Sequence, residues 1–499
     1  DEVIYKLRTL INSVQAHNLV TQNELFKKWI FEENSYPFGK DGRMIPIKFF
    51  GTIKKEELEK NEYIVTNQWV YPCEEGGKRL DIVLVVNGFP LVIGELKTPV
   101  RSAITYLDGI SDILNYEKSI PEMFVTNVFN FATEGKCFRY GSAPANLWGP
   151  WHTADHKSEG NLIDVKTSIE DMITPEKVMD IFEFFTMFAT DKHYRKYKII
   201  CRYQQYEGAN AIIQRVIAGY PKKGLIWHFQ GSGKSLLMVF AAQKLRMTPE
   251  LKNPTVVIVD DRIDLETQIT ATFNASDIPN MASANSKEEL IAFFKGDMRK
   301  ILITTIFKFG EVNGELNRRD NIILMVDEAH RTQEGNLGEK MRIALPNAFF
   351  FGLTGTPINR VDHNTFNTFG AADRSGYMSK YSFSDSIRDK ATLPLNFEPV
   401  PMDLHIDKET LDKEFDALTD GLSEEQKAEL SAKVNMKAIF YNPSRIKKVC
   451  EHIVKHFREK IEPNGYKGQV VCYDRECCIR YKEVFDTLMS PEETTVVID

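Results

Sequence analysis

The sequence predicts an α/β protein in which an N-terminal mixed-sheet domain precedes parallel-sheet lobes, the second of them incomplete. Residues 63–97 hold short runs of β-branched and aromatic residues around the turn Asn87-Gly88, which is typical of an antiparallel hairpin. From residue 224 on, buried apolar runs alternate with helical patterns, and this alternation predicts a parallel sheet covered by helices. A polar stretch at residues 160–174 predicts a linker. The expected domains are 1–170, 171–375 and 376–499.

Composition bounds the class of protein. The 499 residues are 42% hydrophobic and 27% charged, which is typical of globular domains. No apolar run is long enough for a membrane span, and the first residues show no secretory signal. Seven cysteines without Cys-x-x-Cys spacing favour a reducing cytoplasm over a zinc site or disulfides. The net charge of −7 means that any binding of DNA must depend on local basic grooves.

Three charged residues interrupt the apolar strands of the first domain. Asp81 lies in one strand, and Glu95 and Lys97 lie in the next. Charges in a sheet are costly unless they are paired or bind metal, and this spacing is that of metal-dependent nucleases. Asp81 and Glu95 would hold Mg²⁺, while Lys97 would orient a water or stabilise charge on a phosphate. The alternative is an ordinary Glu-Lys pair at the exposed end of a hairpin.

The hairpin register tests this hypothesis. Glu95 and Lys97 are two positions apart, so they share a face of their strand. Asp81 joins that face only if the two residue numbers of each cross-strand pair add up to an even number. We therefore expect a three-residue loop with a glycine bulge, in place of a two-residue turn. A helix predicted over residues 102–119 would then lie over the site, and we predict DNA contacts from its Tyr116.

A phosphate-binding loop is predicted in the second domain. An apolar strand enters a glycine turn that is followed by Lys-Ser and a helical pattern. Glycines let several N–H groups point at one anion, and the helix N-terminus adds partial positive charge. Lys234 would reach the outer phosphates, and Ser235 would hold Mg²⁺. His228 stands where the usual pattern has glycine, and a chance glycine turn is the alternative. The predicted loop residues are Gly231, Ser232, Gly233, Lys234 and Ser235.

Further polar residues follow the buried strands, where parallel sheets bind ligands. Asp327 would hold the Mg²⁺ of ATP, Glu328 would position the attacking water, and His330 would couple neighbouring motifs. The segment Leu353-Thr354-Gly355-Thr356-Pro357 closes a later strand. Gln205 is predicted to read the adenine edge, with Gln204 close behind it and a surface role as the alternative. DNA phosphates are expected to contact Arg262 and Thr305.

The order of these motifs resembles the superfamily 2 helicase and translocase core. Together with the Asp81…Glu95-x-Lys97 hairpin, it resembles the restriction (R) subunit of type I restriction-modification enzymes. The matching stretches are 86–92, 227–235, 326–331 and 353–358, and His228 agrees with this family, although the family commonly has Thr where Phe229 stands. Several related nucleases carry Gln-x-x-x-Tyr on the helix over the site, where this chain has Asp112 and Tyr116.

This resemblance implies a PD-(D/E)xK endonuclease domain and RecA-like lobes with a P-loop and a DEAH box. It implies ATP and Mg²⁺ as cofactors, and ATP-driven translocation on double-stranded DNA coupled to DNA cleavage. Methyltransferase (M) and specificity (S) subunits would be the partners. Two alternatives stay open: a DNA repair or remodelling translocase with an inactive nuclease-like domain, and a nucleotide-gated DNA-binding scaffold without motor activity.

The last part of the chain is expected to begin a second lobe. Residues 407–434 read as a charged helical insertion and residues 443–460 as a basic amphipathic helix. Strands are predicted at residues 468–475 and at residues 496–499. Because no later segment offers the arginine residues that such motors place across the ATP cleft, we expect a fragment of a longer protein.

Overall fold

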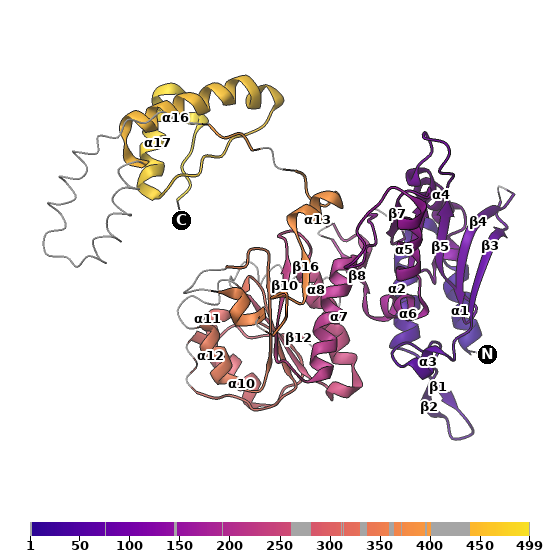
Figure 1. Ribbon diagram of the computed structural model, residues 1–499. Helices are drawn as coiled ribbons and strands as arrows, with labels where there is room; N and C mark the ends of the chain where they lie inside the picture. Colours follow the sequence, from indigo (N-terminus) through magenta and orange to yellow (C-terminus); the bar gives the residue numbers. More distant parts are fainter. Residues whose placement is uncertain are drawn as a thin grey trace. The chain divides into compact units, whose positions relative to one another are not determined.

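The fold is described from a computed structural model, shown as a ribbon in Figure 1. Its described residues are 2–74, 76–143, 147–191, 193–260, 281–310, 312, 314–329, 337–358, 364–370, 372–394, 397–400 and 440–498. The chain divides into two compact units, residues 1–394 and residues 395–499, and each unit is described by itself.

A five-stranded mixed sheet forms the centre of the N-terminal domain, as predicted. Its strands are β3 (Tyr63–Tyr71), β4 (Lys78–Val86), β5 (Phe89–Leu96), β6 (Phe129–Thr133) and β7 (Phe138–Gly141), in the order β3-β4-β5-β6-β7. Only β5 and β6 run parallel, and the other neighbours are antiparallel. The helix α4 (Tyr106–Ser119) makes the crossover between the parallel pair and packs on both of its strands (Figure 1).

The turn between β4 and β5 differs from the expected loop. Val86 pairs with Phe89, so only Asn87 and Gly88 lie in the turn. Both turn residues have positive φ, 50° and 83°, as a type I′ turn requires. The expectation of a three-residue loop is therefore wrong, because Asn-Gly already supplies the backbone conformation of the tightest hairpin turn.

A β-bulge inside β5 restores the register that the loop does not supply. The pairing shifts next to Leu84, which lies opposite Val92, so Leu91 is an extra residue on β5. Beyond this bulge the two residue numbers of each cross-strand pair add up to an even number, as in the pair of Ile82 with Gly94. Asp81 therefore comes opposite the residue after Gly94, which is Glu95. The predicted shared face is confirmed, although a bulge produces it.

Smaller elements surround this sheet. They are α1 (Glu2–Asn12), α2 (Leu19–Phe31), β1 (Ser35–Phe38), β2 (Arg43–Pro46), α3 (Lys55–Leu58), α5 (Leu162–Met172), α6 (Pro175–Phe184), β8 (Thr186–Thr190) and β9 (Lys196–Ile200). The expectation of a linker at residues 160–174 is wrong, because Asn161 caps α5 by accepting bonds from the N–H groups of Ile163 and Asp164. α6 begins at Pro175 as predicted, with Thr174 as its cap.

The second domain is built on a seven-stranded parallel sheet. The strands are β10 (Lys223–His228), β11 (Thr255–Asp260), β12 (Met281–Ser283), β13 (Ile301–Thr305), β14 (Ile322–Val326), β15 (Phe349–Thr354) and β16 (Ser379–Tyr381), in the order β12-β13-β11-β14-β15-β10-β16. Its helices are α7 (Tyr203–Ala218), α8 (Lys234–Met247), α10 (Lys287–Lys295), α11 (Ile306–Gly310), α12 (Leu337–Ala344) and α13 (Phe383–Arg388).

Both faces of the parallel sheet are buried, which explains why its strands are apolar throughout. Alternate residues of one strand belong to different cores: Ile258 lies in the core with α7 and α8, and Val257 lies in the core with α10, α11 and α12. Figure 1 shows these two groups of helices on opposite sides of the strands. The predicted parallel α/β lobe is confirmed.

The N-terminal domain and the α7–α8 side of the parallel sheet share one continuous hydrophobic core. α6 and its C-cap residue connect them. Phe182 of α6 stacks on Phe26 of α2 with ring centroids 6.3 Å apart, and the C-cap residue Phe185 has its ring centroid 5.5 Å from that of Phe240 of α8. Because aromatic side chains bury large apolar areas, this core supports residues 1–394 as one compact unit.

The described residues 440–498 of the second unit contain two helices of 14 residues. α16 (Pro443–His456) and α17 (Arg475–Leu488) pack around a small core that includes Cys450 and Tyr481. The described residues 440–498 contain no strand, so the expectation of a strand at 468–475 is wrong. The strand expected at 496–499 is absent from its described residues 496–498, and residues 407–434 lie outside the described part of the chain. Within the described residues, no helix is long and apolar enough to span a membrane.

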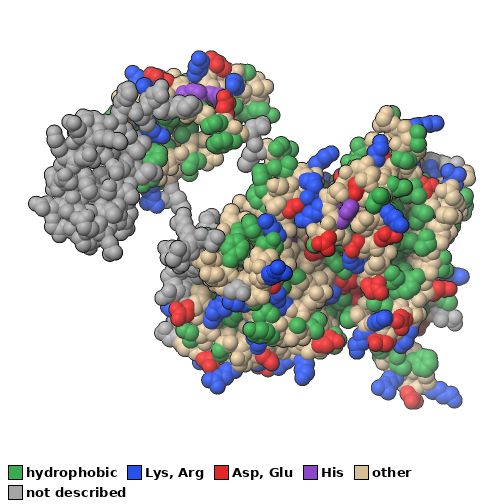
Figure 2. All heavy atoms as spheres, viewed as in Figure 1, with side chains coloured by type: hydrophobic (Ala, Val, Ile, Leu, Met, Phe, Trp, Pro, Cys, Tyr) green, Lys and Arg blue, Asp and Glu red, His purple; other side chains and the backbone are tan. Residues whose placement is uncertain are grey.

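Figure 2 shows the charges on one face of the described residues. Lys and Arg side chains alternate there with Asp and Glu, and no single basic patch covers this face of the described chain. This mixture agrees with the negative net charge of the whole sequence.

Gly94 offers a test of the packing in the N-terminal sheet. A Cβ at this position would lie 2.1 Å from Cζ of Phe131, whose ring covers Gly94 from β6. We expect Gly94→Ala to lower the free energy of unfolding by about 1–3 kcal/mol, as overpacking does. Urea denaturation measures this change. In the Gly94→Ala/Phe131→Leu double variant the combined loss should be smaller than the sum of the single losses, and simple additivity would contradict the predicted contact.

Candidate functional site

Two carboxylates meet across the strands β4 and β5. The Leu96 N–H donates to Oδ2 of Asp81 at 3.0 Å, and the Asp81 N–H donates to Oε1 of Glu95 at 3.4 Å. From β3, the amide of Gln68 donates to Oδ1 of Asp81 at 2.9 Å. Each oxygen of Asp81 is therefore oriented by a donor, and its carboxylate is held beside that of Glu95.

Lys97 completes this group. Its backbone N–H donates to the carbonyl of Thr133 at 2.8 Å, which fixes the residue at the end of β5. Its Nζ lies 3.3 Å from Oε2 of Glu95 and also pairs with Asp112 of α4. The structure thus brings together Asp81, Glu95 and Lys97, the three residues that the hairpin pattern singles out, and adds a third carboxylate. We call these four residues the carboxylate–lysine cluster.

Burial decides the electrostatics of the cluster. The side chain of Glu95 is only 2% exposed. Burial, and after it the charge of Asp81, raises the pKa of Glu95 to about 7. Burial opposes the charged form of Lys97, but its bonds to Asp112 and Glu95 outweigh burial, and its pKa is raised. The cluster therefore holds a buried carboxyl group that its carboxylate neighbour destabilises as an anion.

The chemistry of Asp81 and Glu95 fits a divalent cation. A cation between them would offset the repulsion that raises the pKa of Glu95. No group of three or more His, Cys, Asp and Glu side chains among the described residues is arranged to hold a metal. Mg²⁺ typically uses one or two carboxylates and keeps several waters, so a two-carboxylate site suits it.

Tyr116 lies at the edge of the cluster and is buried. Its hydroxyl donates to the carbonyl of Arg79 at 3.0 Å, and burial followed by the charge of Glu95 raises its pKa. The hydroxyl thus holds α4 against β4. A DNA contact through Tyr116 stays a prediction, and this hydrogen bond competes with it.

The predicted phosphate loop has the backbone that such a loop needs. Gly231 and Gly233 have φ of 82° and 83°, a conformation that favours glycine. Lys234 is the first residue of α8, so the loop leads directly into a helix N-terminus. Its Nζ lies 3.6 Å from Oε1 of Glu328, which links the loop to the end of β14.

The order of the sheet explains how these motifs meet. β14, β15 and β10 are neighbours and run parallel, so their carboxyl ends share one edge. Asp327 accepts a bond from the Glu328 N–H at 2.9 Å, and Glu328 has a left-handed φ of 42°. Directly after β15, Gly355 lies against the loop backbone, because a Cβ there would be 2.8 Å from the nitrogen of Gln230.

His228 has a structural position beneath this loop. Its ring is fully buried, and Nε2 lies 2.8 Å from Oγ of Ser379 on the neighbouring β16. Burial, and then the charges of Lys234 and Lys157, lowers the pKa of His228 to about 3. A neutral histidine therefore ties β10 to β16 where a glycine would leave a gap.

Gln205 is buried and contacts the same loop. Its Oε1 accepts from the N–H of Arg202 at 2.8 Å, and its Nε2 donates to the carbonyl of Gly233 at 3.0 Å. Gln204 donates to the carbonyl of Ser232 at 3.4 Å. Both glutamines support the loop backbone. The adenine contact of Gln205 stays a prediction, and the surface role is excluded by its 3% exposure.

The remaining predicted contacts fall in different places. Thr305 ends β13 with only 3% of its surface exposed, so a DNA contact there would have to use its backbone or follow a rearrangement. Arg262 and His330 lie outside the described residues. Their predicted roles stay predictions.

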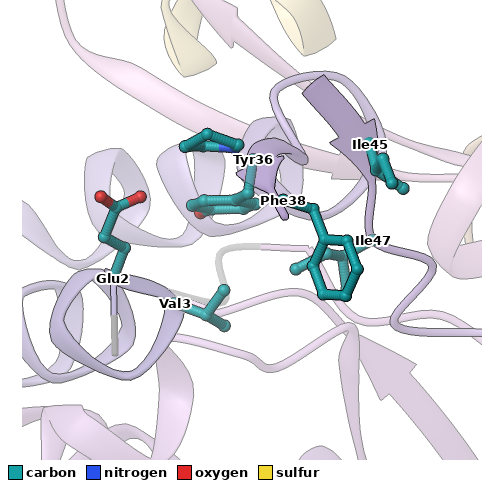
Figure 3. Close-up of a pocket in the computed structure, with 7 residues that line it drawn as sticks. Glu2, Val3, Tyr36, Phe38, Ile45 and Ile47 are labelled. Carbon is teal, nitrogen blue, oxygen red and sulfur yellow. The ribbon is translucent and has the colours of Figure 1, made fainter. Parts of the chain in front are cut away.

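An apolar pocket of about 300 Å³ lies between α1 and the β1–β2 hairpin (Figure 3). None of its lining residues belongs to the carboxylate–lysine cluster or to the phosphate loop. They are Glu2, Val3, Tyr36, Pro37, Phe38, Ile45 and Ile47. This pocket holds no group of catalytic side chains.

Two contacts of the cluster were not foreseen from the sequence. The amide of Gln68 orients Asp81, and Asp112 pairs with Lys97. No sequence pattern pointed to Gln68, because its backbone has a positive φ of 53°, which is unusual for glutamine. Asp112 carried a weak signal, because its position on a predicted helix placed it over the hairpin.

Two families match separate parts of the chain. Residues 2–147 match the family described as "Type I restriction enzyme R protein N terminus". Residues 204–428 match the family described as "SWI2/SNF2 ATPase". The first match covers the carboxylate–lysine cluster, and the second covers the phosphate loop and the strand ends around it.

Curated relatives match nearly the whole chain. The "Type I restriction enzyme HindI endonuclease subunit" of Haemophilus influenzae is 31% identical over 93% of this chain and 46% of its own length. The "Putative type I restriction enzyme MjaIXP endonuclease subunit" of Methanocaldococcus jannaschii is 28% identical over 100% of this chain and 50% of its own. The chain thus spans about half the length of these relatives.

Solved structures are less similar. The structure titled "Sulfolobus solfataricus SWI2/SNF2 ATPase core in complex with dsDNA" is 14% identical, covers 57% of this chain and 59% of its own, and has a TM-score of 0.27. A TM-score this low leaves the fold assignment to the sheet order and to the matching families.

The buried His228 predicts a pH effect on stability. Between about pH 6.5 and its folded pKa, the unfolded chain binds a proton that folded His228 does not bind. Its contribution to stability is therefore complete above the unfolded pKa and falls as the pH falls. From about pH 6.5 to about pH 5 we expect the wild-type protein to lose about 2 kcal/mol more than His228→Asn, which keeps a partner for Ser379. Urea denaturation at several pH values measures this, and parallel pH profiles would contradict it.

Proposed function

We propose that the chain belongs to the R-protein family of type I restriction enzymes and cuts double-stranded DNA while an ATP-driven motor moves along it. The matches of residues 2–147 to the R-protein N-terminal family and of residues 204–428 to the SWI2/SNF2 ATPase family support this proposal. The convergence of Asp81, Glu95 and Lys97 on one face of a hairpin carries the nuclease part of this proposal. The domains we propose are a PD-(D/E)xK nuclease over 1–170, a RecA-like motor lobe over 171–375 and the start of a second lobe over 376–499.

In the nuclease, each residue has a role that its position supports. Asp81 and Glu95 would hold Mg²⁺, with the remaining ligands from backbone carbonyl and water. When bound, the metal polarises a phosphate and favours ionisation of a water. Lys97 offers an ammonium group next to Glu95, where it would donate to that water or to a phosphate oxygen that gains charge.

In the motor, the residues at the shared strand edge would bind and hydrolyse ATP. The loop Gly231–Ser235 would surround the phosphates with N–H groups, and Lys234 would neutralise the outer phosphates. Ser235 and Asp327 would hold Mg²⁺. Glu328 would orient the attacking water, since its ion pair with Lys234 shows that it reaches the phosphate loop.

The chain spans about half of its relatives' length, so the activity and the partners of a whole R protein are proposals for it. Methyltransferase and specificity subunits are proposed as partners that select the DNA site. Contacts of the motor with DNA are proposed to go to phosphates, because a motor that moves along any sequence must not read bases.

Lys234 tests the motor. In the full-length protein assembled with its partner subunits, Lys234→Ala should lower DNA-stimulated ATP hydrolysis at least about 100-fold, because the charge that stabilises the phosphates is lost. Initial-rate assays with and without DNA measure this. Lys295→Ala, an exposed lysine of the same lobe, is the matched control and should be unchanged. If DNA does not stimulate the wild-type hydrolysis, a nucleotide-gated scaffold without motor activity is the better reading.

Lys97 tests the nuclease separately. Lys97→Ala should abolish cleavage of double-stranded DNA by the assembled enzyme and leave its DNA-stimulated ATP hydrolysis intact, since the two sites use different residues. Gel assays of DNA cleavage measure the first effect. Lys118→Ala, an exposed lysine on α4, should cut normally. Undiminished cleavage by Lys97→Ala would refute the nuclease assignment and favour a translocase with an inactive nuclease-like domain.

A further inference from the structure

One face of α4 lies over the carboxylate pair. Gly109, Asp112 and Tyr116 are three and four positions apart, so they line the same side of the helix. Tyr116 bonds to the backbone of β4, and Asp112 pairs with Lys97 at the end of β5. The helix is thereby attached to both strands of the hairpin.

Gly109 sets the distance of this helix from the sheet. A Cβ at position 109 would lie 3.1 Å from Cβ of Ala132 and 3.3 Å from Cβ of Glu95. Both distances are shorter than ordinary van der Waals contacts, so glycine permits an approach that any larger residue would resist. This approach brings the short side chain of Asp112 within reach of Lys97.

Lys97 lies between two carboxylates of different exposure. Glu95 is 2% exposed, Lys97 is 19% exposed and Asp112 is 45% exposed. The ammonium group therefore has a buried partner on the strand and a partner on the solvent side from the helix. A lysine side chain is a flexible four-carbon chain. The contact of Lys97 Nζ with Glu95 Oε2 at 3.3 Å is therefore a weak restraint by itself.

We propose that Asp112 is a positioning residue of the nuclease: it restrains the ammonium group of Lys97 beside Glu95, where that group would contact the DNA phosphate. This inference rests on the proposed nuclease function. Placement of a reacting group to within about 1 Å can change a rate about 100-fold, so a restraint of this kind has a measurable effect. The third N–H of Lys97 stays available for water or phosphate.

The effect on cleavage should separate from the effect on DNA binding. With the full-length protein and its partner subunits, Asp112→Asn should lower the single-turnover cleavage rate at saturating DNA about 10- to 100-fold. DNA affinity should stay the same or increase, because a negative charge near the phosphate is removed. Asp112→Glu, which keeps the carboxylate, should recover part of the rate. Cleavage kinetics and fluorescence-anisotropy binding measure the two quantities.

The matched control is Asp108→Asn. Asp108 is on the same helix but accepts from the Thr105 N–H at 2.7 Å, and asparagine retains that acceptor. This variant removes the same charge from α4 and should cut at the wild-type rate.

The outcomes distinguish this inference from the proposed function. Full cleavage by Asp112→Asn, with Lys97→Ala inactive, would overturn the positioning role alone. A parallel loss of cleavage, DNA binding and DNA-stimulated ATP hydrolysis in Asp112→Asn would show a structural role and also overturn it. Full cleavage by Lys97→Ala would refute the nuclease function itself, and with it this inference.

Discussion

The buried carboxylate of Glu95 is the constraint on which the N-terminal domain depends. An isolated carboxylate in a sheet interior is costly, so its neighbours have to offset its charge or favour its neutral form. The bulge at Leu91 brings Asp81 opposite it, Lys97 pairs with it, and Gly109 lets α4 cover it. The result is a small polar site inside an apolar sheet.

The phosphate loop depends on a different support. Its backbone is held from one side by Gln204 and Gln205 of α7 and from another by Gly355 after β15. The same helix also contacts the N-terminal domain, because Trp151 lies against Tyr206 with ring centroids 5.5 Å apart. α7 therefore contacts both the loop and the segment that follows the N-terminal sheet.

Local pattern predicted the strands around the candidate site well and the connections between elements poorly. The strands that carry Asp81 and Glu95 and the strand that ends before Asp327 were foreseen, because buried strands and turns have strong local signals. The prediction of a linker at residues 160–174 was wrong, because Asn161 caps a helix there although the segment is polar. The strand at residues 468–475 was wrong as well, because a strand forms only where a neighbour pairs with it.

The sequence by itself determined the chemistry: which carboxylates, which lysines and which glycines this protein can use, and the order of its two domains. Residue type and spacing are local properties, so they could be read without coordinates. The tertiary structure alone decided the register through Leu91 and the contact of Lys97 with Asp112. Both depend on how separate elements approach one another, and a bulge or a helix packing distance leaves no periodic trace in the chain.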